Sequence, residues 1–121
     1  MLLRIFRARL RPGHEDKALR QMRELAERWT REAEGLRAVH VARRLENDVQ
    51  HVEVVSVWRD TEALAAALGP RWQRPFLPGN IEELVDRPTV SLMETIFDHS
   101  VSDASSDGSP PDEPPPRPRA A

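Results

Sequence analysis

The first candidates for chemistry are four polar side chains in the middle of the chain, His40, Arg44, His51 and Glu53. A histidine close to a carboxylate can serve as a base near neutral pH. These residues lie in two valine-rich segments on either side of Asn47-Asp48, and both Asn and Asp tolerate the positive φ angles of a tight turn. If the segments pair as antiparallel strands, the four side chains share one face. Because that face points away from the expected helices, an interface is the favoured place for them, with a catalytic base as the alternative.

The same residues make a poor metal site. In the expected register, position 40 lies opposite position 55 rather than opposite His51, and no third ligand is evident. The chain has no cysteine, which excludes disulfides, thiolate catalysis and cysteine metal sites. It also has no glycine-rich phosphate loop and no paired catalytic carboxylates. The sequence therefore predicts neither a metal nor a cofactor.

Aromatic residues beside apolar segments are the candidates for binding a small molecule. Trp58 ends a strand, where it is either an aromatic wall against a flat substrate or a core residue under the second helix. Trp72 lies in a proline-bracketed loop that either covers a pocket or seals the end of a small core. Phe6 lies in the first strand. We predict substrate contacts from all three and assign no catalytic residue.

Two arginines are the charged members of mostly apolar strand faces. Arg4 shares its face with Phe6, and Arg43 shares its face with valines. A buried arginine needs an anionic partner. That partner is either a carboxylate or phenolate ligand or, as the favoured alternative, Glu94 of the last strand. Arg4 and Arg43 complete the predicted substrate site.

The helices and strands that position these residues are predicted from the spacing of apolar residues and from residues that start or end an element. Apolar residues spaced by three and four predict a helix over 14–34, and Asp60 caps a second helix over 61–68. An Asn80-to-Glu83 capping pattern predicts a short helical turn that ends at Pro88. Strands are predicted over 2–10, 37–45, 50–58 and 90–97. This order predicts an α+β fold, the ferredoxin-like βαββαβ unit with an antiparallel sheet.

The expected hairpin register divides the sheet into two faces. The more apolar face, with Val39, Val41, Val52, Val54 and Trp58, should meet the helices. The other face is left bare although it carries Val55 and Val57, and a bare half-apolar face on a small domain predicts a partner surface. A second copy of the chain, packed face to face, would close a dimeric barrel.

The chain divides near residue 99. We predict one ferredoxin-like domain over 1–99 and a disordered Ser/Asp/Pro-rich tail over 100–121, because the tail has too few apolar residues to form a core. Its four acidic residues and two arginines account for the net charge of −2 of the chain, so the domain is formally neutral, which argues against nucleic acid. We found no membrane-length apolar run and no secretory signal, and we expect a cytoplasmic protein.

The segment VVSVWRDTEALAAAL resembles the signature of the antibiotic biosynthesis monooxygenase domain, in which a strand ends in Trp before an acidic cap and an EAL helix. EGLRAVHVARR and VSLMETI fit the family in the same order, and the resemblance extends to about Phe97. It implies a dimeric α+β barrel with a pocket between the sheet and the helices. Some members oxidise aromatic polyketides to quinones with O2 and without metal or flavin, and another branch degrades haem.

Departures from the family pattern narrow the expected activity. The haem-degrading branch needs a histidine ten residues after the Trp and an asparagine in the first strand, and Leu68 and Phe6 stand there instead. The quinone-forming branch uses a tyrosine, and this chain has none. These departures favour a protein that binds without catalysis. The family-like corner and the aromatic residues with few polar groups nevertheless lead us to predict a cofactor-independent monooxygenase of a small aromatic or polyketide-like molecule. The alternatives are a dimer that only binds such a ligand and haem binding through another histidine.

Overall fold

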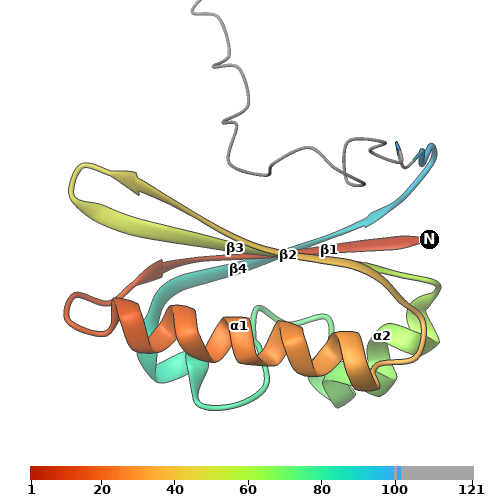
Figure 1. The fold of residues 1–121 in the computed structure, drawn as a ribbon, viewed down its shortest axis with the longest axis horizontal. Helices are drawn as coiled ribbons and strands as arrows, with labels where there is room; N and C mark the ends of the chain where they lie inside the picture. The colour runs from red at the N-terminus through yellow and green to blue at the C-terminus, as the bar shows by residue number, and fades with distance from the viewer. Residues whose placement is uncertain (100, 102–121) are drawn as a thin grey trace, which may run out of the picture.

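The computed structural model describes residues 1–99 and 101, and its four strands form one antiparallel sheet in the order β2-β3-β1-β4. Both α-helices cover the same face of the sheet, which we call the inner face (Figure 1). This arrangement confirms the predicted ferredoxin-like α+β fold. The predicted tail lies outside the described residues, except for Val101. The elements are β1 (Leu2–Leu10), α1 (Glu15–Glu32), β2 (Leu36–Glu46), β3 (Val49–Trp58), α2 (Thr61–Leu68), the short 3-10 turns η1 (Gly69–Arg71) and η2 (Ile81–Leu84), and β4 (Val85–Glu94).

The β2–β3 hairpin has the predicted register. Asn47 and Asp48 both take positive φ angles, 51° and 63°, as a two-residue turn between twisted strands requires. His40 lies opposite Val55, and Arg44 lies opposite His51. Alternate residues of β3 are buried from position 52 to 58, so the predicted division between inner and outer faces is confirmed.

Both helices form where their sequence patterns place them. The stripe Ala18, Met22, Leu25 and Trp29 of α1 is buried against the sheet. Helix α1 starts one residue after the predicted start and ends at Glu32, two residues before the predicted end. Helix α2 begins after Asp60, whose Oδ1 accepts a hydrogen bond from the Ala63 backbone N at 2.8 Å. This carboxylate satisfies one of the free N–H groups of the first turn.

The last strand differs from its predicted bounds. It starts at Val85 rather than at residue 90, and it ends at Glu94. Pro88 was expected to precede the strand, but a proline is tolerated on an edge strand because no ladder hydrogen bond is needed there. The β1–β4 pairing shifts between Arg7 and Arg9, which places two residues of β4, Arg87 and Pro88, opposite one residue of β1. The predicted Asn80 capping box is also wrong, since its side chain makes no cap hydrogen bond.

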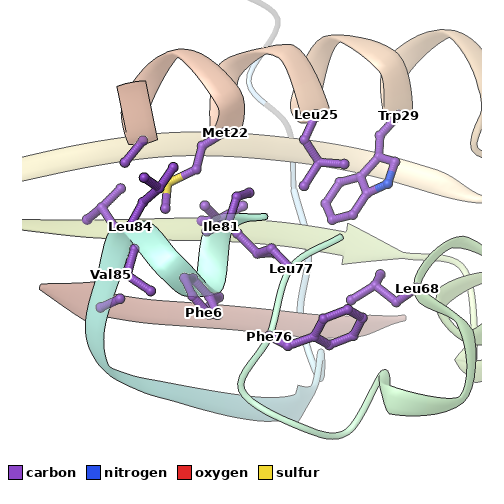
Figure 2. Close-up of a cluster of buried hydrophobic side chains, with 14 of the residues drawn as sticks. Phe6, Met22, Leu25, Trp29, Leu68, Phe76, Leu77, Ile81, Leu84 and Val85 are labelled. Carbon is purple, nitrogen blue, oxygen red and sulfur yellow. The ribbon is translucent and has the colours of Figure 1, made fainter. Parts of the chain in front are cut away.

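A long connection fills the space between α1 and the sheet. In Figure 2, Leu77 and Ile81 lie between Met22 and Leu25 of α1 on one side and Phe6 of β1 on the other. All five side chains are buried. The segment between α2 and β4 is therefore a third layer of the core, so one end of the inner face is covered by a loop and a 3-10 turn.

Candidate functional site

Trp58 lies in the core, at the end of β3. Its side chain is fully buried, and its ring meets Trp29 of α1 edge to face, with 5.4 Å between centroids. Edge-to-face pairs of this kind stabilise a core beyond the area that they bury. The indole still carries a polar group, because Trp58 Nε1 is buried with no hydrogen-bond acceptor among the described residues.

Arg4 is buried on the same inner face, with 1% of its surface exposed. Its guanidinium does not pair with Glu94, which is exposed. It donates instead to three backbone carbonyl oxygens, from Nε to Trp72 at 3.1 Å and from Nη2 to Arg74 and Phe76 at 2.7 and 2.8 Å. The expected ion pair is therefore wrong. The partners are backbone dipoles of a loop about 70 residues away in sequence.

Burial without a carboxylate partner changes the acidity of Arg4. Desolvation disfavours the charged form and lowers the pKa of Arg4 to about 10. The guanidinium is still a cation at neutral pH. Its third nitrogen, Nη1, is buried with no acceptor among the described residues. The inner face thus holds a positive charge with one free donor.

These two free donors come from neighbouring strands. Arg4 pairs with Ser56 across β1 and β3, and Trp58 lies two residues further along β3 on the same face. Diagonal neighbours of this kind have Cβ atoms about 7–8 Å apart, within reach of long side chains. Such a pair of N–H groups can bind an anionic oxygen of a flat ligand.

The other predicted substrate contacts lie apart from this pair. Phe6 follows Arg4 by two residues in β1 and is buried. It borders a cavity of about 290 Å³ that is also lined by the 75–88 connection. Trp72 is half-buried, and its carbonyl is one of the three that Arg4 binds. Arg43 is exposed on the edge strand β2, so it is not the buried arginine that the sequence indicated. The structure brings Arg4, Phe6, Trp58 and Trp72 to one layer and leaves Arg43 outside it.

Arg43 borders an apolar groove between α1 and β2. The groove has a volume of about 510 Å³ and opens along the edge of the sheet. Its walls are mostly hydrocarbon, and polar groups stand at its rim. Its lining includes Leu19, Ala26, Thr30, Val39 and Val41. Sequence reasoning placed Val39 and Val41 on the inner face, but it gave no sign that α1 leaves this edge uncovered.

The four polar residues of the hairpin do not form a catalytic base in this arrangement. They lie on the outer face, as expected from the register. Glu53 pairs with Arg7 of β1 at 3.1 Å rather than with a histidine, and His40 is exposed. Within residues 1–99 and 101, no group of three His, Asp or Glu side chains is arranged to hold a metal ion. No helix in the same residues is long and apolar enough to cross a membrane.

Solved structures share this fold. A protein from Deinococcus radiodurans has a TM-score of 0.65 and 16% identity, over 84% of this chain and 99% of its own. A structure described as an antibiotic biosynthesis monooxygenase has a TM-score of 0.63 and 25% identity, over 80% and 100%. SnoaB of Streptomyces nogalater, a cofactor-independent oxygenase solved as a mutant, has a TM-score of 0.58 and 14% identity, over 80% and 94%.

Sequence comparison narrows the assignment from fold to family. No curated protein matches the chain. The sequence profile of the antibiotic biosynthesis monooxygenases, however, matches residues 1–70, which hold β1, α1, the β2–β3 hairpin and α2. These elements contribute Arg4, Phe6 and Trp58 to the inner face. The chain therefore belongs to the antibiotic biosynthesis monooxygenase family.

Proposed function

We propose that this protein is a cofactor-independent monooxygenase that binds a small aromatic, polyketide-like substrate between the sheet and the helices. The substrate binds as its phenolate, with the anionic oxygen at Arg4 Nη1 and Trp58 Nε1. The observation that carries the proposal is that these two donors are buried without acceptors on one face of the sheet. Unpaired buried donors are rare in folded proteins, so a ligand that satisfies both is a physical reason for them.

A cation and an indole N–H favour the ionised substrate over the neutral phenol. Donors that stabilise a developing oxyanion in a dry site commonly supply the largest part of a rate enhancement. The electron-rich phenolate reacts with O2 at a ring CH2 group. One oxygen atom becomes the new carbonyl, and the other leaves as water together with the two hydrogens of that carbon. This balance needs no oxidant other than O2.

Entry to this site requires the 72–77 segment to move. The segment lies against Arg4, and it is held by the three carbonyl contacts of the guanidinium. Substrate binding therefore exchanges some of these contacts for contacts to the phenolate. Movements of a covering loop of this kind often limit turnover. Trp72 lies on the moving segment, and its half-buried ring is available to contact the substrate.

Quinone formation from an anthrone-type phenol under O2 tests the proposal. We expect the wild-type protein to form the quinone, and Trp58→Phe to lower kcat about 100-fold, because this change removes one oxyanion donor and keeps an aromatic ring. Trp29→Phe is the matched control, since it removes the same atoms from the neighbouring ring of the Trp pair and should leave kcat within a few-fold. If no quinone forms and no such phenol shifts the tryptophan fluorescence, the proposal fails.

Binding without catalysis is the second candidate function. It is favoured by the absence of a base, because among the described residues Arg4 and Ser56 are the only buried polar or charged residues. A substrate that is not already acidic would then bind without being oxidised. A phenol that shifts tryptophan fluorescence but causes no O2 consumption over many hours would support this alternative.

We also propose that two copies of the chain pack through the apolar half of the outer face of the sheet. One half of this face is apolar, with Leu3, Ile5, Val55, Val57 and Met93 in adjacent register. Ile5 is almost fully buried already, and Met93 is 44% exposed. An apolar patch of this kind on a small domain favours association.

Val55→Asp is expected to convert the dimer into a folded monomer, because a carboxylate at the centre of the apolar half would be buried without a partner. Size-exclusion chromatography with light scattering measures the mass, and circular dichroism checks the fold. Thr61→Asp adds the same charge at the exposed start of α2, and it should remain a dimer. A Val55→Asp protein with unchanged mass would contradict the packing through this face.

A further inference from the structure

Arginines gather at the end of the sheet beyond the apolar half of the outer face. Beyond Ile5 and Val55, the strands bring Arg7, Arg9, Arg43, Arg44 and Arg87 around one groove of about 510 Å³. We call it the arginine groove. The β2–β3 hairpin, whose outer side forms one wall, bends away from the helices at this end (Figure 1). The groove is lined by all four strands, and none of the aromatic residues of the inner face belongs to its lining.

The charges of the arginine groove are not balanced. Glu53 is its only carboxylate, and it pairs with Arg7 at 3.1 Å. Arg44 pairs with Glu46 at 3.1 Å, outside the lining of the groove. Arg9, Arg43 and Arg87 pair with no carboxylate in the part of the chain that the structure describes. The domain is formally neutral, so this concentration of cations is a local property of the groove.

Backbone geometry adds a second observation at the same place. Arg87 has a φ angle of 49°, in the left-handed region that costs a residue with a Cβ about 1–2 kcal/mol. It lies in the irregularity of the β1–β4 pairing opposite Ala8, and bulges of this kind redirect a side chain. Arg87 of the fourth strand, β4, lies at this irregularity and belongs to the lining of the groove.

We propose that the arginine groove binds a small molecule that carries two adjacent oxyanion groups, as a diphosphate does. Arginine presents several N–H donors in a planar fork that matches phosphate and carboxylate oxygens. Two adjacent oxyanion groups can contact more of these guanidinium groups, which come from four strands, than one group can. His51 stands in the same lining and offers a ring N–H. This site is separate from the proposed monooxygenase site, and neither depends on the other.

Calorimetric titration of the full-length protein with inorganic pyrophosphate tests the site. We expect saturable binding at low ionic strength, weaker binding of orthophosphate, and a loss of affinity with added salt, because the groove is open to solvent. Arg9→Ala and Arg87→Ala should each weaken pyrophosphate binding about tenfold, as loss of one charge-assisted contact predicts. Glu53→Gln should strengthen it, because it removes the one negative charge in the groove.

Arg20→Ala is the matched control, since it removes the same charge from an exposed position on α1, in the helical layer. Its affinity for pyrophosphate should equal that of the wild type. If Arg20→Ala weakens binding as much as Arg9→Ala does, the protein attracts anions only through its overall electrostatic field. The proposed binding site in the arginine groove would then be wrong. Absence of saturable pyrophosphate binding to the wild type, or weaker binding in Glu53→Gln, would overturn it as well.

Discussion

Replacement of Gly35 by alanine is expected to lower the free energy of unfolding by about 2–5 kcal/mol. Gly35 joins α1 to β2 with a φ angle of +88°, which an alanine adopts only with strain. A Cβ built there would stand 2.5 Å from the Cβ of Ala63 in α2, so the second helix would have to shift. The Gly35 carbonyl also accepts a 2.7 Å hydrogen bond from Arg59, which fixes the connection in place.

Gly13→Ala separates the two causes of this loss. Gly13 has nearly the same φ angle, +86°, but nothing lies within 4 Å of its would-be Cβ. Its replacement should cost only the backbone strain, about 1–2 kcal/mol. Denaturant unfolding followed by tryptophan fluorescence gives both values. Equal losses in the two variants would show that α2 moves aside without penalty, and that the close approach does not matter.

The fold was predictable because its signals are local. Asn47-Asp48 sets the turn, the turn sets the register, and alternation along β3 sets which residues face the helices. The apolar stripe of α1 and the Asp60 cap of α2 are also signals that lie within a short stretch of sequence. The last strand was misplaced because Pro88 is a breaker in most contexts, and only its position on an edge strand makes it acceptable. That position depends on the strand order, which the local sequence does not encode.

The candidate sites were less predictable because they depend on contacts between distant segments. Arg4 was expected to meet a carboxylate, but it meets carbonyl oxygens of the 72–76 loop. Main-chain acceptors leave no trace in the residue types. The arginine groove was missed for a related reason. Arg7, Arg9 and Arg87 come together only through the pairing of β1 with β3 and β4, whereas the hairpin register alone places only Arg44, His51 and Glu53 of the groove on that face.

Arg4→Met is expected to release the 72–76 segment and to lower the free energy of unfolding by about 2–4 kcal/mol. Each of the three hydrogen bonds that the guanidinium makes should contribute about 1.5–3 kcal/mol, because the donor is charged. Methionine keeps an unbranched stem and removes the buried charge, and with it the desolvation penalty that lowers the pKa of Arg4, which offsets part of the loss. The remaining loss arises because the three loop carbonyl oxygens lose their donor and must form hydrogen bonds with water instead.

Limited trypsinolysis reports the release directly, because the bond after Arg71 lies at the start of the segment. In the folded protein Arg71 is held by Glu82 at 3.1 Å and lies over the Phe76 ring, so cleavage requires the segment to open. We expect cleavage to be at least about 30-fold faster in Arg4→Met, since each loss of about 1.4 kcal/mol raises the open population tenfold and the expected loss is about 2 kcal/mol or more. Arg7→Met is the control, because it makes the same change on the outer face of β1, where an exposed pair with Glu53 contributes at most about 1 kcal/mol. Equal cleavage in both variants would mean that Arg4 does not hold the segment, and the proposed route to the inner site would then need another gate.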